Sequence, residues 1–366
     1  MLKNFWYLLG QVLSILMSFV LLVVALGILA IGIGIGIGSN LNTEELEPSA
    51  YTYLFGDEMS SNYLLKVPIE GVILGSLPQN YDAAQWFSEE GIVYGYEIQD
   101  ILLEAAKDST IKGVLLEMQT PGGTIFGAWA IFDGIKTYRD KTGNPVVAYV
   151  QGMSASGGVL AMVGSNEIYA DHGSLVGSIG VIGDTLTYFN KPTAIEGGLF
   201  GGGITTKDGI EQTIVSAGKG KDLGDPFRRP TKEELKLLQE GVDYEYDLFV
   251  KHVADNRNID PKTIRDKMGA HVFDNETAKK FGLINGTLNY RDAVKRLAEL
   301  AQIETDDYQL IQTAAKTHGL LSSLLGVFRP HSAPPNTSSL KSQFCNKFNR
   351  LPLAYYGNPR QVCARH

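Results

Sequence analysis

Hydrophobic and polar positions divide the chain into an apolar start, an acidic connecting segment and a long region of alternating strand and helix patterns. No charged residue occurs between Lys3 and Glu44, and the stretch from Phe5 to Ile37 is almost wholly apolar. About 20 apolar residues are enough for a helix to cross a bilayer, whereas the apolar core of a secretory signal spans only about 7–15 residues. We therefore expect residues 1–38 to form a membrane anchor, with a cleaved signal peptide as the competing interpretation.

Charges on either side of this span predict its orientation. Lys3 precedes the apolar stretch, and Glu44, Glu45 and Glu47 follow it. Positively charged flanks stay in the cytoplasm. We therefore expect a single-pass protein of the cell membrane, with a cytoplasmic N-terminus and an extracytoplasmic catalytic domain. Residues 39–62 are polar and acidic, and they are predicted to be a linker.

From Tyr63 onward, short apolar runs alternate with amphipathic stretches. Strand patterns cover residues 64–73, 113–117, 145–150 and 167–170, and helix patterns cover residues 96–107, 126–138 and 159–163. A chain in which strands and helices alternate folds as an α/β domain with a mostly parallel sheet. We expect one such domain over residues 63–320.

The later part of the chain is predicted to be mainly helical. Thr231 is a candidate N-cap and Glu234 stands at the capping-box position, so a helix should run from there to about Asn256. Shorter helices are expected from Asp260 and over residues 275–281, and residues 290–316 are predicted to be a peripheral helix. Residues 321–366, where the composition shifts to Pro, Ser and Asn, are predicted to be a disordered tail.

Composition excludes several classes of protein. Apolar residues make up 44% of the 366 residues, which excludes a mainly disordered chain. The net charge of −8 argues against a nucleic-acid partner, because such proteins carry a basic surface. Two cysteines, Cys345 and Cys363, are too few for a disulfide-built core or a cysteine-rich metal site. We expect neither a metal nor a cofactor.

Two glycine-rich turns follow predicted strands and carry the candidate chemistry. They are residues 120–123, Thr-Pro-Gly-Gly, and residues 155–158, Ala-Ser-Gly-Gly. Glycines let main-chain N–H groups face a cleft, and two converging N–H groups form an oxyanion hole. Ser156, beside the N–H of Gly157, is the candidate nucleophile. The competing interpretation is a pair of ordinary tight turns.

A serine nucleophile needs a base. His172 is the histidine nearest to the serine turn in sequence, but its neighbour Asp171 is badly placed to orient the ring of the adjacent residue. A lysine can act only when neutral, so its pKa must fall from about 10.4, which burial can achieve. Lys219 and Lys221 are the candidates.

Four motifs in this order resemble the signal peptide peptidase A (protease IV) family of membrane-anchored serine peptidases. They are residues 120–123, 153–158, 177–182 (Gly-Ser-Ile-Gly-Val-Ile) and 217–222 (Ala-Gly-Lys-Gly-Lys-Asp). The resemblance implies a fold related to the Clp protease subunit and the crotonases, and a Ser-Lys dyad. Motif by motif, Ser156 matches the nucleophile, Lys221 the general base and Ser178 a serine that positions the lysine.

The resemblance also implies an oxyanion hole formed by the main-chain N–H of Gly157 with that of Gly123 or Gly122. It implies a homo-oligomer, in which neighbouring subunits can share Ser and Lys, and peptide substrates such as signal-peptide remnants. The segment between Ser178 and Lys221 is longer than the family's and contains a glycine-rich insertion at residues 197–203, which keeps Lys219 open as the base. A crotonase-like acyl-CoA enzyme and a non-catalytic membrane scaffold are the alternatives.

Overall fold

The computed structural model describes residues 17–18, 21–22, 51–76, 91–190, 209, 211–304, 306–313 and 353–356. The chain divides into two units, residues 1–50 and 51–366. The predicted membrane anchor lies outside the described residues except for four of its positions. Within the described part of the chain, no helix is both long enough and apolar enough to cross a bilayer.

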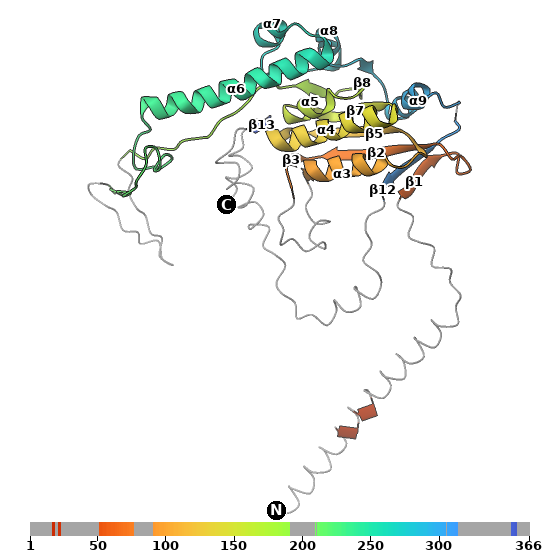
Figure 1. Ribbon diagram of the computed structural model, residues 1–366, viewed down its shortest axis with the longest axis horizontal. Coiled ribbons are helices and arrows are strands. Elements are labelled where there is room, and N and C mark those ends of the chain that lie inside the picture. The colour runs from red at the N-terminus through yellow and green to blue at the C-terminus, as the bar shows by residue number, and fades with distance from the viewer. Residues whose placement is uncertain are drawn as a thin grey trace, which may run out of the picture. The chain divides into compact units, whose positions relative to one another are not determined.

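A mainly parallel sheet forms the centre of the larger unit (Figure 1). In spatial order its strands are β1 (Tyr51–Gly56), β12 (Gln309–Thr313), β2 (Tyr63–Glu70), β5 (Ile111–Thr120), β7 (Val146–Ala155), β8 (Glu167–Ala170) and β11 (Gly286–Thr287). Pairing is parallel from β12 to β11, and β1 is added antiparallel to β12. The end of β7 also pairs in parallel with β9 (Leu175–Gly177), which in turn pairs antiparallel with β10 (Val272–Phe273).

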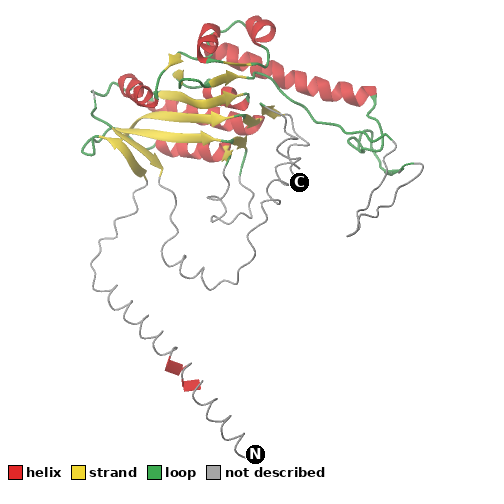
Figure 2. Ribbon diagram, turned by 180° about the vertical axis from the view of Figure 1, so that it is seen from behind, coloured by secondary structure: helices red, strands yellow, loops and turns green. Residues whose placement is uncertain are grey.

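Helices cover both faces of this sheet, as seen from behind in Figure 2. On one face lie α3 (Gly95–Ala105), α4 (Ile125–Thr142) and α5 (Gly157–Met162), and on the other lies α9 (Tyr290–Leu300). The long helix α6 (Lys232–Arg257) is followed by α7 (Pro261–Thr263), the π-helical turn η1 (Ile264–Met268) and α8 (Asn275–Phe281).

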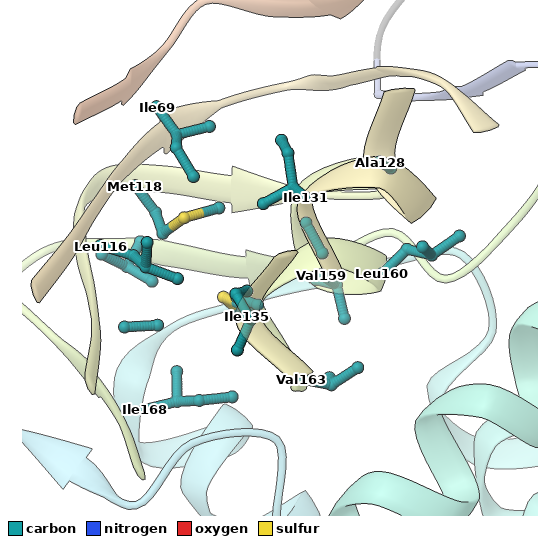
Figure 3. Packing of buried hydrophobic residues seen from close by; sticks show 14 of the residues in the cluster. Ile69, Leu116, Met118, Ala128, Ile131, Ile135, Val159, Leu160, Val163 and Ile168 are labelled. Carbon is teal, nitrogen blue, oxygen red and sulfur yellow. The ribbon is translucent and has the colours of Figure 1, made fainter. Parts of the chain in front are cut away.

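The central strand β5 explains why the core sits on both sides of the sheet. Its residues are buried almost without a break, as expected for a parallel strand covered on both faces. Leu116 and Met118 face α4 and α5, where Ile131 and Val159 pack against them (Figure 3). Leu115 faces the opposite side and belongs to the cluster that contains α9.

A second, smaller sheet lies beside the ends of these strands. Its order is β13 (Leu353–Tyr355), β6 (Gly122–Thr124), β3 (Val72–Leu74) and β4 (Ile92–Tyr94). Strand β3 runs parallel to β4 and β6, and β13 runs antiparallel to β6. The end of the turn at residues 120–123 therefore belongs to strand β6, which pairs with β13 on one side and with β3 on the other.

The α/β class predicted from the sequence is confirmed by this sheet and its helices. The helix N-cap at Thr231 is also confirmed: its side chain accepts a hydrogen bond from the N–H of Glu234, and the Glu234 side chain accepts one from the N–H of Thr231. Local signals of this kind are strong because they satisfy main-chain groups at the helix end within four residues.

Three segments differ from the sequence-based predictions. The helix predicted over 290–316 is wrong in its second half: α9 ends at Leu300, and residues 309–313 form β12 inside the sheet. Residues 51–56, placed in a linker, form β1, and residues 353–355, placed in a disordered tail, form β13. All three are short strands whose partners are remote in sequence, so no local periodicity marks them. Apart from residues 353–356, the predicted tail from 321 onward, Cys345 and Cys363 included, lies outside the described residues.

Strand β12 offers a test of the sheet order. Leu310 is fully buried in the cluster under α9, so Leu310→Ala should lower the free energy of unfolding by about 2–5 kcal/mol, measured by urea denaturation. Met59→Ala is the matched control, because that side chain is 91% exposed and its loss should change stability by less than about 0.5 kcal/mol. Equal stabilities of the two variants would contradict the position of β12 inside the sheet.

Candidate active site

Ser156 occupies the sharp connection between β7 and α5. Its φ of 55° and ψ of −114° lie where residues with a Cβ are rarely found. The conformation is held by its N–H, which donates to the Gly177 carbonyl at 2.8 Å, and by its carbonyl, which accepts from the N–H of Leu160 at 3.0 Å. Strained backbone of this kind clusters at functional sites, because the surrounding structure must hold it in place.

Ser178 lies beside Ser156 because β7 and β9 run parallel, with Ala155 paired to Gly177. Its φ is also positive, at 59°, and its N–H donates to the His271 carbonyl at 2.6 Å. The Ser156 hydroxyl donates to the Gly180 carbonyl at 3.4 Å. The structure thus brings the two predicted serines together at the end of the sheet.

The two glycine turns meet through their main chains. A Cβ placed on Gly157 would lie 3.1 Å from the nitrogen of Gly123, and one placed on Gly122 would lie 2.6 Å from the nitrogen of Gly157. Only glycine permits this approach, because side chains would fill the space between the two amides. The amides of Gly123 and Gly157 therefore lie close to one another and beside Ser156, as an oxyanion hole requires.

Thr120 holds the first of these turns. Its hydroxyl oxygen accepts a hydrogen bond from the N–H of Gly122 at 3.0 Å, and the residue is buried. This fixes Gly122 in its left-handed conformation, with φ of 92°. The sequence motif contained Thr120, but no role was predicted for it; a hydroxyl two residues before a glycine is the signal that indicates such a turn.

The two candidate lysines lie in a loop before α6. The ammonium group of Lys219 contacts both carboxylate oxygens of Glu233 at 2.6 and 2.7 Å, and its side chain is exposed. Lys221 is exposed as well, and its N–H donates to the Gly218 carbonyl at 3.1 Å. Among the described residues, neither lysine makes a hydrogen bond to Ser156.

Arg228 fastens this loop to the start of α6. Its guanidinium contacts the Asp222 carboxylate at 2.6 and 2.8 Å and the Glu234 carboxylate at 2.7 and 2.9 Å. The hydrogen bonds from Arg228, and then the one from the N–H of Thr231, lower the pKa of Glu234 to about 2. Arg228 likewise lowers the pKa of Asp222. The backbone around Lys221 is therefore tied to the N-terminal end of α6.

The N-terminal end of α6 is remote from the serine site, which lies near the other end of this helix. Near its other end, the His252 ring contacts the Leu160 carbonyl at 2.9 Å, one helical turn from Ser156. Eighteen residues of helix, at 1.5 Å each, separate Glu234 from His252, a span of about 27 Å. The Lys221 loop is therefore remote from Ser156 within one chain.

The histidines have other surroundings. His172 lies 3.4 Å from the Asp171 carboxylate at a turn, with its side chain 79% exposed, whereas Ser156 is fully buried. His252 is enclosed by the rings of Trp129 and Phe132, and burial lowers its pKa. Its contact with Leu160 makes it a structural link between α6 and α5.

Comparisons with known proteins assign the family. A profile described as peptidase family S49 matches residues 138–304. The chain is 34% identical over 208 residues to a candidate protease of Methanocaldococcus jannaschii, covering 57% of this chain and 62% of that protein. It is 30% identical over 270 residues to a candidate signal peptide peptidase of Enterococcus faecium, covering 73% and 71%. Protease 4 of Salmonella typhi is 28% identical over 244 residues, covering 66% and 37%.

These matches assign the molecule to the class of serine-type peptidases. The chain belongs to peptidase family S49, which confirms the resemblance drawn from the four motifs. It spans less than two thirds of the Methanocaldococcus and Salmonella relatives. Membership in this family favours a peptidase over an acyl-CoA enzyme or a non-catalytic scaffold.

Two solved structures align with part of the chain. They are mutant forms of a membrane-bound stomatin-specific protease, at 15% identity over 64% of this chain and 83% of that one, and of ClpP1 from Listeria monocytogenes, at 12% identity over 63% and 94%. Both have a TM-score of 0.37, which is too low to define the fold. The fold assignment therefore rests on the strand order and connections of the chain itself.

Gly122 is a sensitive position of the site. In Gly122→Ala, the new methyl group would collide with the Gly157 amide, so peptidase activity should fall by about 10²-fold or more, as when one oxyanion donor is lost. Gly143→Ala is the matched control: its φ is also positive, at 70°, but nothing lies within 4 Å of the added Cβ. Similar kcat/KM values for both variants would contradict an oxyanion hole at this place.

The Arg228 contacts predict a pH-dependent loop. Glu234→Gln should speed amide hydrogen exchange over residues 218–229, whereas Glu233→Gln, which removes only the exposed partner of Lys219, should not. Because the pKa of Glu234 is depressed in the folded state, its contribution is complete above about pH 4.5 and is lost as the pH falls toward 2. Equal exchange in the two variants would show that the loop is held by other contacts.

Proposed function

We propose that this chain is a membrane-anchored serine endopeptidase that cleaves apolar peptides with a Ser-Lys dyad. One observation carries the proposal: Ser156 lies in a strained turn, beside Ser178, where the amides of Gly157 and Gly123 approach each other. A nucleophile beside two converging main-chain N–H groups is the arrangement that acyl transfer requires.

In the proposed reaction the Ser156 oxygen attacks the carbonyl carbon of a peptide bond while the neutral amine of Lys221 takes the hydroxyl proton. The N–H groups of Gly157 and Gly123 stabilise the negative oxygen of the tetrahedral intermediate. The C–N bond then breaks, the leaving amine takes the proton from the lysine, and water releases the acyl group from Ser156. Ser178, beside the nucleophile, would accept or donate the hydrogen bond that orients the lysine.

Assembly of several copies of the chain would bring the general base, Lys221, to Ser156. Since Lys221 is tied to the remote end of α6, we propose that it reaches Ser156 of a neighbouring subunit in a homo-oligomer. The exposed apolar side chains of α6 support such an assembly, among them Leu237 at 63% and Tyr244 at 61% exposure. Residues of this kind on an extended helix are typical of a protein–protein contact.

Membrane attachment fits the substrate class. The apolar stretch at residues 5–37 and the acidic residues after it favour a single-pass anchor with the catalytic domain outside the cytoplasm. A peptidase held at the bilayer surface meets apolar peptides released there, and the Enterococcus faecium relative is named for signal-peptide cleavage. We therefore propose signal-peptide remnants or similar apolar peptides as substrates.

Three variants of the full-length protein test the dyad. Ser156→Ala and Lys221→Ala should each lower kcat for a fluorogenic apolar peptide by about 10³-fold or more, because each removes a group that acts only in the transition state. Lys219→Ala should retain activity and serves as the matched control, since it removes a neighbouring lysine that is paired with Glu233. Full activity of Ser156→Ala would refute the mechanism, and loss of activity in Lys219→Ala alone would transfer the role of base to Lys219.

Mixing the two inactive variants tests the shared site. If Lys221 acts on the neighbouring subunit, co-expressed Ser156→Ala and Lys221→Ala chains should regain a fraction of wild-type activity, because some interfaces then combine an intact serine with an intact lysine. Ser156→Ala mixed with the double variant gives the control without any such interface. Mixed assemblies as inactive as this control would place both groups in one chain.

A further inference from the structure

Helix α5 begins directly after Ser156 and is only six residues long. A helix this short leaves most of its main-chain groups without partners inside the helix, so its position depends on contacts from neighbouring elements. Its first residue, Gly157, carries one of the proposed oxyanion donors, and the N–H of Leu160 donates to the Ser156 carbonyl at 3.0 Å. A shift of α5 therefore moves the proposed nucleophile and one of its donors together.

The other end of α5 is held by a side chain from α6. The C-terminal half of α6 lies beside α5 (Figure 1), and the Nε2 atom of His252 lies 2.9 Å from the Leu160 carbonyl oxygen. The preceding carbonyl, that of Val159, accepts from the N–H of Val163 at 3.2 Å. His252 thus supplies a partner from outside the helix to a carbonyl of its last turn, where such groups lack partners within the helix.

Contacts at both ring nitrogens assign the tautomer of His252. A carbonyl oxygen can only accept, so Nε2 carries the proton that is donated to Leu160. On the other side of the ring, the side-chain nitrogen of Asn256 lies 3.4 Å from Nδ1 and donates to the His252 carbonyl at 2.8 Å. Since that nitrogen is a donor, Nδ1 is the acceptor, and the ring is protonated at Nε2 alone.

The surroundings of the His252 ring favour this neutral form. The residue is buried, and its ring packs against those of Trp129 and Phe132 on α4, at centroid distances of 4.3 and 4.4 Å. Burial lowers the pKa of His252 in spite of the carboxylates of Asp133 and Asp255, so the ring is uncharged at neutral pH. The hydrogen bond to α5 is shielded from water here, which makes it stronger than one at the surface.

From these contacts, and on the basis of the function proposed above, we infer that His252 is a positioning residue of the peptidase reaction. Its Nε2–H fixes the last turn of α5, and α5 in turn fixes the Ser156 turn and the Gly157 amide. A misplacement of about 1 Å in such groups can lower a rate by about 10²-fold. The helix that holds the Lys221 loop at one end thereby also holds the nucleophile of its own chain near the other.

Two replacements of His252 in the full-length protein test the inference. His252→Gln keeps an N–H donor near the place of Nε2, whereas His252→Phe keeps an aromatic ring and has no donor. With a fluorogenic apolar peptide, His252→Phe should lower kcat by about tenfold or more and leave KM within about twofold, because misplaced groups slow the chemical step. His252→Gln should keep at least about half of the wild-type kcat. Equal kcat values for the two variants would overturn the inference.

Val253→Ala is the matched control for a general loosening of α6. Val253 is the next residue of this helix, is fully buried and has no polar group in its side chain. The variant should lower the free energy of unfolding, measured by urea denaturation, and leave kcat within about twofold of the wild type, because the hydrogen bond to α5 remains. A kcat as low as that of His252→Phe would overturn the role of the hydrogen bond.

The tautomer can be measured without altering His252. In the Ser156→Ala protein labelled with nitrogen-15 histidine, the His252 ring should show a protonated Nε2 and an unprotonated Nδ1 near neutral pH. The signal is assigned by its loss in the double variant that also carries His252→Gln. A ring protonated at Nδ1 alone would overturn the inference, because its Nε2 could not donate to Leu160.

Hydrogen exchange separates this inference from the proposed function, because it needs no catalysis. In the Ser156→Ala background, His252→Phe should speed exchange of the amides of residues 160–163, and His252→Gln should leave it unchanged. Unchanged exchange with His252→Phe would overturn the positioning role even if the peptidase proposal holds. Activity retained by Ser156→Ala would instead overturn the peptidase proposal, while the exchange result would still report on how α5 is held.

Discussion

Close approach of two main-chain turns, after β5 and after β7, is the constraint on which the site depends. Parallel pairing of these strands brings their ends to one edge of the sheet. Glycines at 122, 123 and 157 then let the turns touch without side chains between them. Because the proposed nucleophile Ser156, the amides of Gly123 and Gly157 and strand β6 all lie at these turns, an added methyl group there affects all of them.

The strained backbone conformation of Ser156 is stabilised by the elements around these two turns. A left-handed serine costs on the order of 1–3 kcal/mol, and it persists only where neighbours over-determine it. Here the hydrogen bond to Gly177 and the short helix α5 meet that requirement. The core beneath, where α4 and α5 pack on β5, is what fixes α5 in place (Figure 3).

Much of this arrangement could be predicted from the sequence, and the features that were not predicted have identifiable physical causes. Strand–helix alternation predicted the α/β class, and the glycine turns pointed to Ser156 and Gly157, because these signals are local. The assignment of Gly123, with Gly122 as the alternative, came from the family resemblance. Strands β1, β12 and β13 were missed because each depends on a partner far away along the chain. The position of Lys221 depends on Arg228 and on the length of α6, neither of which local patterns can relate to Ser156.

Strand β12 has a consequence for how the molecule is made. It lies between β1 and β2, so the N-terminal strand β1 pairs with no other strand of the described sheet until residues 309–313 have been synthesised. Contacts of such long sequence separation form slowly and late. During translation, the apolar N-terminal stretch therefore emerges from the ribosome some 270 residues before the sheet can close. The α/β unit therefore cannot be completed until nearly all of its strands have been synthesised.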